Sequence, residues 1–172
     1  MLNNFLMNKS LRLDLILFSL AILAQASFAQ VKPDKSQIEF QTFLAKLDAA
    51  QLELQNGRAE TFKSMWSRAD DITLSGGFGG NIEKGWTNVG GRLNWVGTRF
   101  SNGRNKIERL VSTAKGEIGY VVQIEHIAFN VPGQAKESSR DYRVTMIFRR
   151  EKGGWRIIHR HADSQMTKQA LQ

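Results

Sequence analysis

The sequence has no cysteine in 172 residues. The chain therefore forms no disulfide and cannot use a thiol in catalysis. Its stability must come from packing of its hydrophobic residues, which make up 41% of the chain. Long apolar runs are also lacking, because no segment after residue 30 approaches the roughly 20 residues needed to cross a bilayer.

The N-terminus has the parts of a secretory signal peptide. Lys9 and Arg12 give a positive start, residues 15–24 are apolar, and small side chains follow up to Ala29. We expect cleavage after Ala29, with Ala26 as the alternative. The chain is thus divided into a signal peptide, residues 1–29, and one domain, residues 30–172. This predicts a periplasmic or secreted protein without an integral membrane segment after cleavage.

Basic residues outnumber acidic ones. The net charge of the chain is +8, and residues 30–172 carry +7 because the leader holds two basic residues and one acidic residue. Such a field favours anionic partners. The basic residues are spread along the chain instead of being clustered, so nucleic acid is not an expected partner.

Hydrophobic periodicity predicts three helices followed mainly by strands. Apolar residues recur at helical spacing over residues 36–55, 59–66 and 86–100, and Ser36 with Glu39 forms a capping-box pair at the first helix. Strands are predicted at residues 72–75, 106–113, 117–129, 142–150 and 155–162. This order predicts an α+β fold, with a curved antiparallel sheet of about five strands and three helices on one face.

Alternation along the last two strands assigns side chains to two faces. One predicted face holds aromatic residues and histidines, among them Tyr142, Met146, His159 and His161, and the other holds Arg143, Thr145 and Arg160. Apolar residues occur on both faces, yet the helices can cover only one. A second copy of the chain is therefore expected to cover the other face.

Several segments carry a resemblance to a known family. They are residues 65–74 (MWSRADDITL), residues 83–86 (EKGW), and the C-terminal runs 142–150 and 154–163. Over residues 37–163 the chain resembles the SnoaL-like branch of the nuclear-transport-factor-2-like superfamily. The resemblance implies a cone-shaped fold with an internal pocket. That superfamily includes isomerases, cyclases, dehydratases and non-catalytic binding domains, so the fold leaves the chemistry open.

Carrying over the ketosteroid-isomerase branch residue by residue does not supply its catalytic groups. Its three catalytic positions fall near Ala50, Gly76 and Thr145, none of which can act as acid or base. The chain also resembles the association domain of calcium/calmodulin-dependent kinases, whose two pocket arginines align with Thr145 and Ala162. That anion clamp is therefore absent in its usual form.

Arg143 and Arg160, which alternation places on the same face, could replace the clamp, since a guanidinium matches a carboxylate or phosphate. Ordinary ion pairing is the competing interpretation, with Glu125, Glu137 and Asp141 as available partners.

The resemblance also suggests which residues surround the pocket. The candidate ligand contacts are Trp66, Phe78, Trp86, Tyr120, Arg143, Thr145 and Arg160. Core packing is an equal alternative for Trp66 and Trp86. His159 and His161 share one side of a strand and could chelate a metal, but packing is favoured, so neither a metal nor a cofactor is predicted.

We therefore expect an exported homodimer that binds a small, partly apolar, anionic molecule inside the cone. One alternative is an isomerase, cyclase or dehydratase acting on a hydrophobic carbonyl compound. Asp71 or His161 would be its general base, and Arg143 or Arg160 its electrostatic helper. A third hypothesis is a non-catalytic interaction module.

Overall fold

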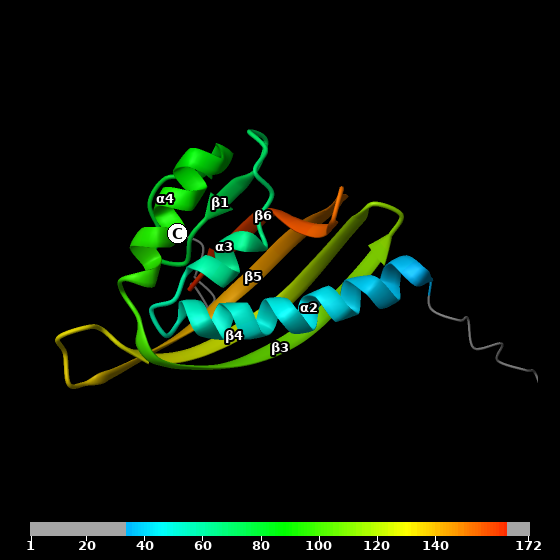
Figure 1. The fold of residues 1–172 in the computed structure, drawn as a ribbon. Helices are drawn as coiled ribbons and strands as arrows, with labels where there is room; N and C mark the ends of the chain where they lie inside the picture. Colours follow the sequence, from blue (N-terminus) through cyan, green and yellow to red (C-terminus); the bar gives the residue numbers. More distant parts are fainter. Residues whose placement is uncertain (1–33, 165–172) are drawn as a thin grey trace, which may run out of the picture. The chain divides into compact units, whose positions relative to one another are not determined.

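The computed structural model describes residues 34–164, and the predicted signal peptide lies outside them. A curved sheet in the order β2-β1-β6-β5-β4-β3 carries the helices on one face (Figure 1). The helices are α2 (Lys35–Leu54), α3 (Glu60–Ser64) and α4 (Gly85–Gly97). The strands are β1 (Thr73–Ser75), β2 (Glu83–Lys84), β3 (Ser101–Lys115), β4 (Ile118–Asn130), β5 (Glu137–Glu151) and β6 (Gly154–Asp163). None of these helices is long and apolar enough to cross a membrane.

The predicted α+β fold with its curved sheet is confirmed, with three differences in the strands. The two-residue strand β2 was not predicted, and β1 pairs with β6 in parallel, with Thr73 opposite His159. Strands β3 and β5 also begin earlier than predicted, at Ser101 and Glu137. Their first residues are polar on both sides, so pairing with β4 forms these ends without any hydrophobic alternation.

The start of α2 is capped differently from the prediction. The Asp34 side chain accepts a hydrogen bond from the Ser36 backbone N–H at 3.4 Å. The Ser36 hydroxyl instead donates to the Gly116 carbonyl at 2.7 Å, and Glu39 forms an ion pair with Arg150. The two members of the expected capping box are thus used to attach α2 to the sheet, and the preceding aspartate takes the capping role.

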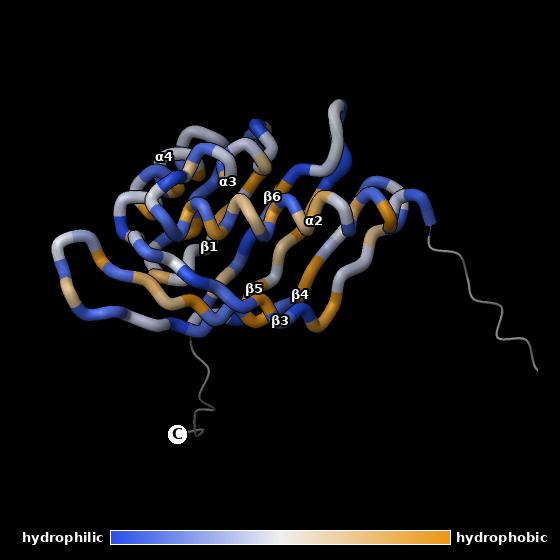
Figure 2. Tube along the Cα trace, turned by 60° about the horizontal axis from the view of Figure 1, so that its bottom comes forward, coloured by the Kyte–Doolittle hydropathy of each residue, from blue (hydrophilic) through white to orange (hydrophobic). Residues whose placement is uncertain are grey.

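The N-terminal half of α2 packs on a solid aromatic core. The Phe40 ring lies 5.1 Å from that of Phe148 and 5.0 Å from that of Trp155, centroid to centroid, and all three residues are buried. Each such side chain contributes about 1.5–3 kcal/mol when fully buried. Figure 2 shows hydrophobic positions alternating with hydrophilic ones along the strands beneath this helix.

Three bulges shape the sheet. Two register shifts occur in β3 and one in β6, where Ile147 pairs with His159 but Phe148 pairs with Ile157. The extra residue in β6 is therefore Ile158. Because a bulge bends its strand and adds one residue to the alternation, every side chain of β6 after Ile158 changes face relative to β5.

A glycine joins the end of α2 to the start of β3. The Asn56 side chain accepts from the Gly103 N–H at 3.0 Å and donates to the Gly103 carbonyl at 3.2 Å. A Cβ atom on Gly103 would lie 2.3 Å from the Gln55 carbonyl oxygen. Only glycine allows the two backbones to approach this closely.

We expect Gly103→Ala to lower the free energy of unfolding by about 1–3 kcal/mol, because the added methyl group must displace backbone. Gly91→Ala is the matched control. A Cβ there meets nothing within 4 Å, and Gly91 lies inside α4, so alanine should be neutral or stabilise by up to ~1 kcal/mol. Urea unfolding followed by circular dichroism measures both, and equal stabilities for the two variants would contradict the prediction.

Candidate functional site

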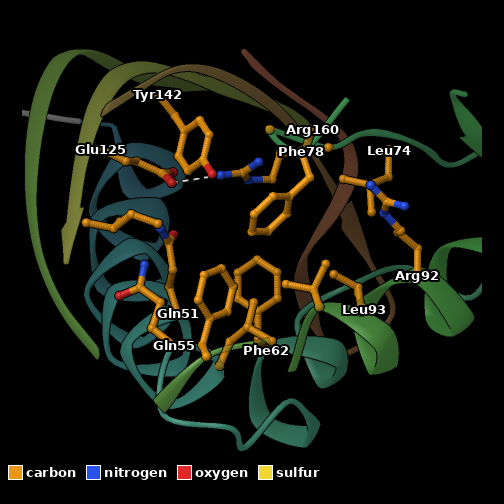
Figure 3. A pocket seen from close by; sticks show the side chains of 16 residues that line it. Gln51, Gln55, Phe62, Leu74, Phe78, Arg92, Leu93, Glu125, Tyr142 and Arg160 are labelled. Carbon is orange, nitrogen blue, oxygen red and sulfur yellow. Dashed lines mark hydrogen bonds and ion pairs between the residues drawn. The ribbon is translucent and has the colours of Figure 1, made fainter. Parts of the chain in front are cut away.

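The C-terminal half of α2 opens onto a cavity of about 70 Å³. Side chains from α2, α3, α4 and the inner face of the sheet line it (Figure 3). Most of its wall is apolar and includes Phe62, Leu74, Leu93, Phe100 and Ile127. The interior of the domain is therefore solid beneath the first half of α2 and hollow beneath the second.

One end of the cavity is polar and contains an ion pair. Glu125 of β4 is 1% exposed, and its Oε2 accepts a hydrogen bond from Arg160 Nη2 at 2.7 Å. Its Oε1 accepts from the side-chain amide of Gln123 at 2.8 Å. Both carboxylate oxygens of Glu125 are thus satisfied, as a charge this deeply buried requires.

The pair belongs to a chain of side-chain contacts that reaches the surface. Arg109 Nε donates to the Gln123 side-chain oxygen at 3.1 Å. The Arg109 guanidinium also binds both carboxylate oxygens of Asp48, at 2.7 and 3.3 Å. Since each group holds the next, this network fixes the orientation of Glu125 at the cavity wall.

Two buried polar atoms in the cavity wall have no hydrogen-bond partner among the described residues. They are the Tyr142 hydroxyl and the Gln55 side-chain oxygen. Burial raises the pKa of the Tyr142 hydroxyl above its usual value of 10, against the opposing effect of Arg140 and Arg160. At neutral pH it is a protonated donor. Figure 3 shows this hydroxyl at the same end of the cavity as the Glu125–Arg160 pair.

A glycine holds the Tyr142 ring in place. A Cβ atom on Gly77 would lie 2.4 Å from the nearest ring carbon of Tyr142, so the glycine backbone lies directly against the ring. Gly77 follows β1 in the loop that also contributes Gly76 and Phe78 to the wall. This loop therefore closes over the polar end of the cavity.

Comparison with models of known protein families identifies the family to which this fold belongs. A family model described as the SnoaL-like domain matches residues 44–167, well over half of the chain. The chain belongs to the SnoaL-like family. None of the curated proteins matches it.

Solved structures share the fold of this SnoaL-like domain at low sequence identity. A nuclear-transport-factor-2-like superfamily protein from Salmonella enterica has a TM-score of 0.64 at 14% identity, covering 76% of this chain and 94% of its own. A candidate dehydratase of the same superfamily from Streptomyces avermitilis has a TM-score of 0.63 at 17% identity, covering 74% and 98%. A candidate calcium/calmodulin-dependent kinase association domain from Thiobacillus denitrificans has a TM-score of 0.59 at 15% identity, covering 73% and 94%. Identities this low show the fold alone.

Of the candidate ligand contacts, the structure places Phe78 and Arg160 in the cavity wall. Trp66 is 1% exposed and belongs to the hydrophobic core, away from the cavity lining. Trp86 is half-buried, with the Arg68 guanidinium stacked 3.4 Å from its ring centroid. The alternative of core packing therefore describes Trp66 and Trp86 better than pocket lining does.

Three further candidates lie on the opposite, outer face of the sheet. Tyr120 is 42% exposed, because its neighbour Gly119 is the residue that meets the Phe40 ring on the inner side. Arg143 and Thr145 are also exposed. The expectation that Tyr120 faces the interior is corrected accordingly.

The shared face predicted for Arg143 and Arg160 is likewise wrong. Arg160 pairs across the sheet with the buried Met146, whereas Arg143 points outward and forms an ion pair with Asp163 at 2.6 Å. The bulge at Ile158 is the reason, since it turns Arg160 inward. Of the expected ion-pair partners, Glu125 is the one that Arg160 uses.

The proposed general bases lie outside the cavity lining. Asp71 is exposed, and the side-chain hydrogen bond from Arg149 lowers its pKa, so it is a poor base. His161 is exposed on the outer face, opposite Thr145. His159 shares that face, and its Nδ1 lies 2.7 Å from the Thr73 hydroxyl. Within residues 34–164 no three histidine or acidic side chains are grouped to hold a metal ion.

Sequence reasoning missed the residues that form the polar end. Alternation along β4 places Gln123 and Glu125 between the buried residues Val121 and Ile127. A carboxylate at such a position is the signal that could have indicated a buried site. Gln55 is similarly buried at the end of the apolar face of α2.

Removing one partner of the buried ion pair should destabilise the domain. We expect Arg160→Met to lower the free energy of unfolding at pH 7 by about 3 kcal/mol, because Glu125 stays buried without its cation. Adding Glu125→Gln should recover most of that loss, since the neutral amide needs no counter-charge. Urea unfolding measures both. If Arg160→Met alone is as stable as the wild type, the Glu125–Arg160 ion pair does not stabilise the polar end of the cavity.

Proposed function

We propose that this SnoaL-like domain binds a small, largely apolar molecule that carries a hydroxyl group. The observation that carries the proposal is the pair of unpartnered buried atoms, the Tyr142 hydroxyl and the Gln55 side-chain oxygen, in an otherwise apolar wall. Buried polar atoms are almost always hydrogen-bonded in folded proteins. A ligand group that accepts from Tyr142 and donates to Gln55 would satisfy both.

The size and charge of the cavity restrict the ligand further. At about 70 Å³ the cavity is well below the ~300–1,000 Å³ of pockets that enclose drug-sized ligands. Only a compact molecule, or one end of a longer one, enters it. Because Glu125 offsets the charge of Arg160, the inner end suits a neutral polar group rather than an anion.

The proposed setting is outside the cytoplasm. The leader at residues 1–29 supports export to the periplasm or beyond. A cysteine-free domain suits an oxidising compartment, because its folding depends on no thiol.

Homodimerisation through the outer face of the sheet is part of the proposal. Ile118 and Tyr120 of β4 are 49% and 42% exposed there, and Val111 of β3 is 38% exposed. The described helices all lie on the other face (Figure 1). A second copy that presents the same surface would cover these residues through a two-fold interface.

The enzyme alternative with Asp71 or His161 as base is not supported by the geometry, because neither side chain lines the cavity. Among the residues that line the cavity the carboxylate is that of Glu125, and both of its oxygens already accept hydrogen bonds. Binding without turnover is therefore the function that the site favours.

The binding proposal predicts an unusual pair of effects for Tyr142→Phe. The variant should be as stable as the wild type or more stable by up to ~1 kcal/mol, because it removes a hydroxyl that has no partner in the empty protein. It should nevertheless bind the co-purifying ligand about tenfold more weakly, since one hydrogen bond is lost.

Native mass spectrometry of the chain purified from an exporting host measures the bound mass, and the intact mass reports whether the chain begins at Gln30. Tyr120→Phe is the control, because it removes the same atom from the outer face. Equal ligand occupancy in the two variants would contradict the proposed site.

The dimer proposal predicts that Tyr120→Asp yields a monomer at micromolar concentration where the wild type is a dimer. A buried, unpaired carboxylate in the interface is unfavourable. Ile38→Asp places the same change at a residue of α2 that is 53% exposed and should leave the dimer intact. Sedimentation velocity measures the mass of each. A monomeric wild type would refute the interface.

A further inference from the structure

An aromatic and arginine cluster adjoins the cavity on its solvent side. Phe78 lines the cavity, and its ring packs edge-on against that of Trp95, which is 38% exposed, with 5.9 Å between centroids. Three guanidinium groups lie over these two rings. We call Phe78, Trp95, Arg92, Arg99 and Arg140 the rim cluster.

The three arginines are held by ring faces. Arg92 and Arg99 lie 4.5 and 4.8 Å from the Trp95 ring centroid; Arg92 is in α4, and Arg99 lies in the turn just after that helix. Arg140 lies 5.2 Å from the centroid of Phe78. A guanidinium stacked on a ring keeps its N–H groups free at its edge, where they can bind an anion.

None of these three arginines has a carboxylate partner within residues 34–164, a property that they share with Arg58, Arg68 and Arg156. Six other arginines do have one within 4.0 Å, namely Arg104, Arg109, Arg143, Arg149, Arg150 and Arg160. Among the described residues, the side-chain hydrogen bond of these three arginines is the one from Arg92 Nη2 to the Gly79 carbonyl, at 3.0 Å. The rim cluster is therefore a concentration of uncompensated positive charge.

The rim cluster faces the same side of the sheet as the cavity. Arg140 of β5 lies directly opposite Ile127 of β4, and Ile127 is part of the cavity wall. Residues opposite each other in an antiparallel pair project to the same face. Arg92 itself also lines the cavity (Figure 3). An anion held at the rim would thus be attached to a molecule that extends inward.

From this arrangement we infer that the ligand is a small monocarboxylate with an apolar body. Its body and neutral polar group occupy the cavity, and its carboxylate binds the rim arginines Arg92 and Arg140. The inference rests on the proposed cavity function and adds the ligand's charge and direction. It also moves the anion contact away from Arg143, which is on the outer face, and from Arg160, which is neutralised by Glu125.

The test compares a short series of hydroxyaryl carboxylates, from 4-hydroxybenzoate to 3-(4-hydroxyphenyl)propionate, with the primary amide of each. Isothermal titration calorimetry at low salt measures the dissociation constants. We expect the best carboxylate to bind about tenfold more tightly than its own amide, because it adds charge-assisted hydrogen bonds. High salt should reduce this preference as the charges are screened.

Substitutions of arginines test whether the preference for a carboxylate over its amide arises at the rim cluster. Arg92→Gln with Arg140→Gln should bring each carboxylate and amide within about twofold of each other, with amide binding unchanged. Arg140→Gln alone should show part of the effect, and its side chain makes no hydrogen bond within the described residues, so the fold is not at risk. Arg58→Gln with Arg156→Gln is the matched control, since it also removes two arginines that lack carboxylate partners and that lie outside the cavity wall.

The outcomes separate the two hypotheses. Equal binding of carboxylate and amide by the wild type would overturn the rim inference and leave the cavity function standing. Loss of the preference in the control pair would also overturn it, because net charge alone would then be responsible. If no member of either series binds, both the inference and the proposed function are overturned. Tyr142→Phe should weaken the binding of carboxylates and amides equally, because both classes place their hydroxyl group in the cavity. This variant therefore separates the contribution of the cavity from that of the rim arginines.

Discussion

Glu125 is 1% exposed on the inner face of the sheet, and a carboxylate at that depth requires a cation and hydrogen-bond donors around it. Arg160 provides the cation only because the bulge at Ile158 turns it inward. Gln123 provides the second contact and is itself held by Arg109. The polar end of the cavity therefore depends on one extra residue in β6.

The same constraint explains why the interior is solid at one end and hollow at the other. Beneath the first half of α2, the Phe40 ring packs against the rings of Phe148 and Trp155, and close packing is favourable. Beneath the second half, the charged pair and Gln55 cannot be covered by apolar side chains without losing their hydrogen-bonding capacity. The loop carrying Gly77 approaches closely enough to enclose the space but not to fill it.

Periodicity in the sequence was sufficient for the helices, the order of the main strands and the faces of β5, because these depend on local alternation. The side-chain directions at the end of β6 were not predictable in this way, since a bulge has no signature in residues as apolar as those around Ile158. The interior position of Gly119, which places Tyr120 outside, depends on the Phe40 ring far away in the sequence. Buried Glu125 was visible in the alternation of β4, yet only the structure shows which of several basic residues neutralises it.

The positively charged arginines of the domain differ in what surrounds them. Arginines such as Arg109 and Arg149 are held by carboxylates, so their charge is compensated where it lies and serves the fold. Arg92, Arg99 and Arg140 are held by aromatic rings, which orient a guanidinium without neutralising it. A basic composition alone indicates only a general preference for anions. The site of that preference depends on where compensation is missing, and within the described residues the rim cluster places three uncompensated arginines beside the cavity.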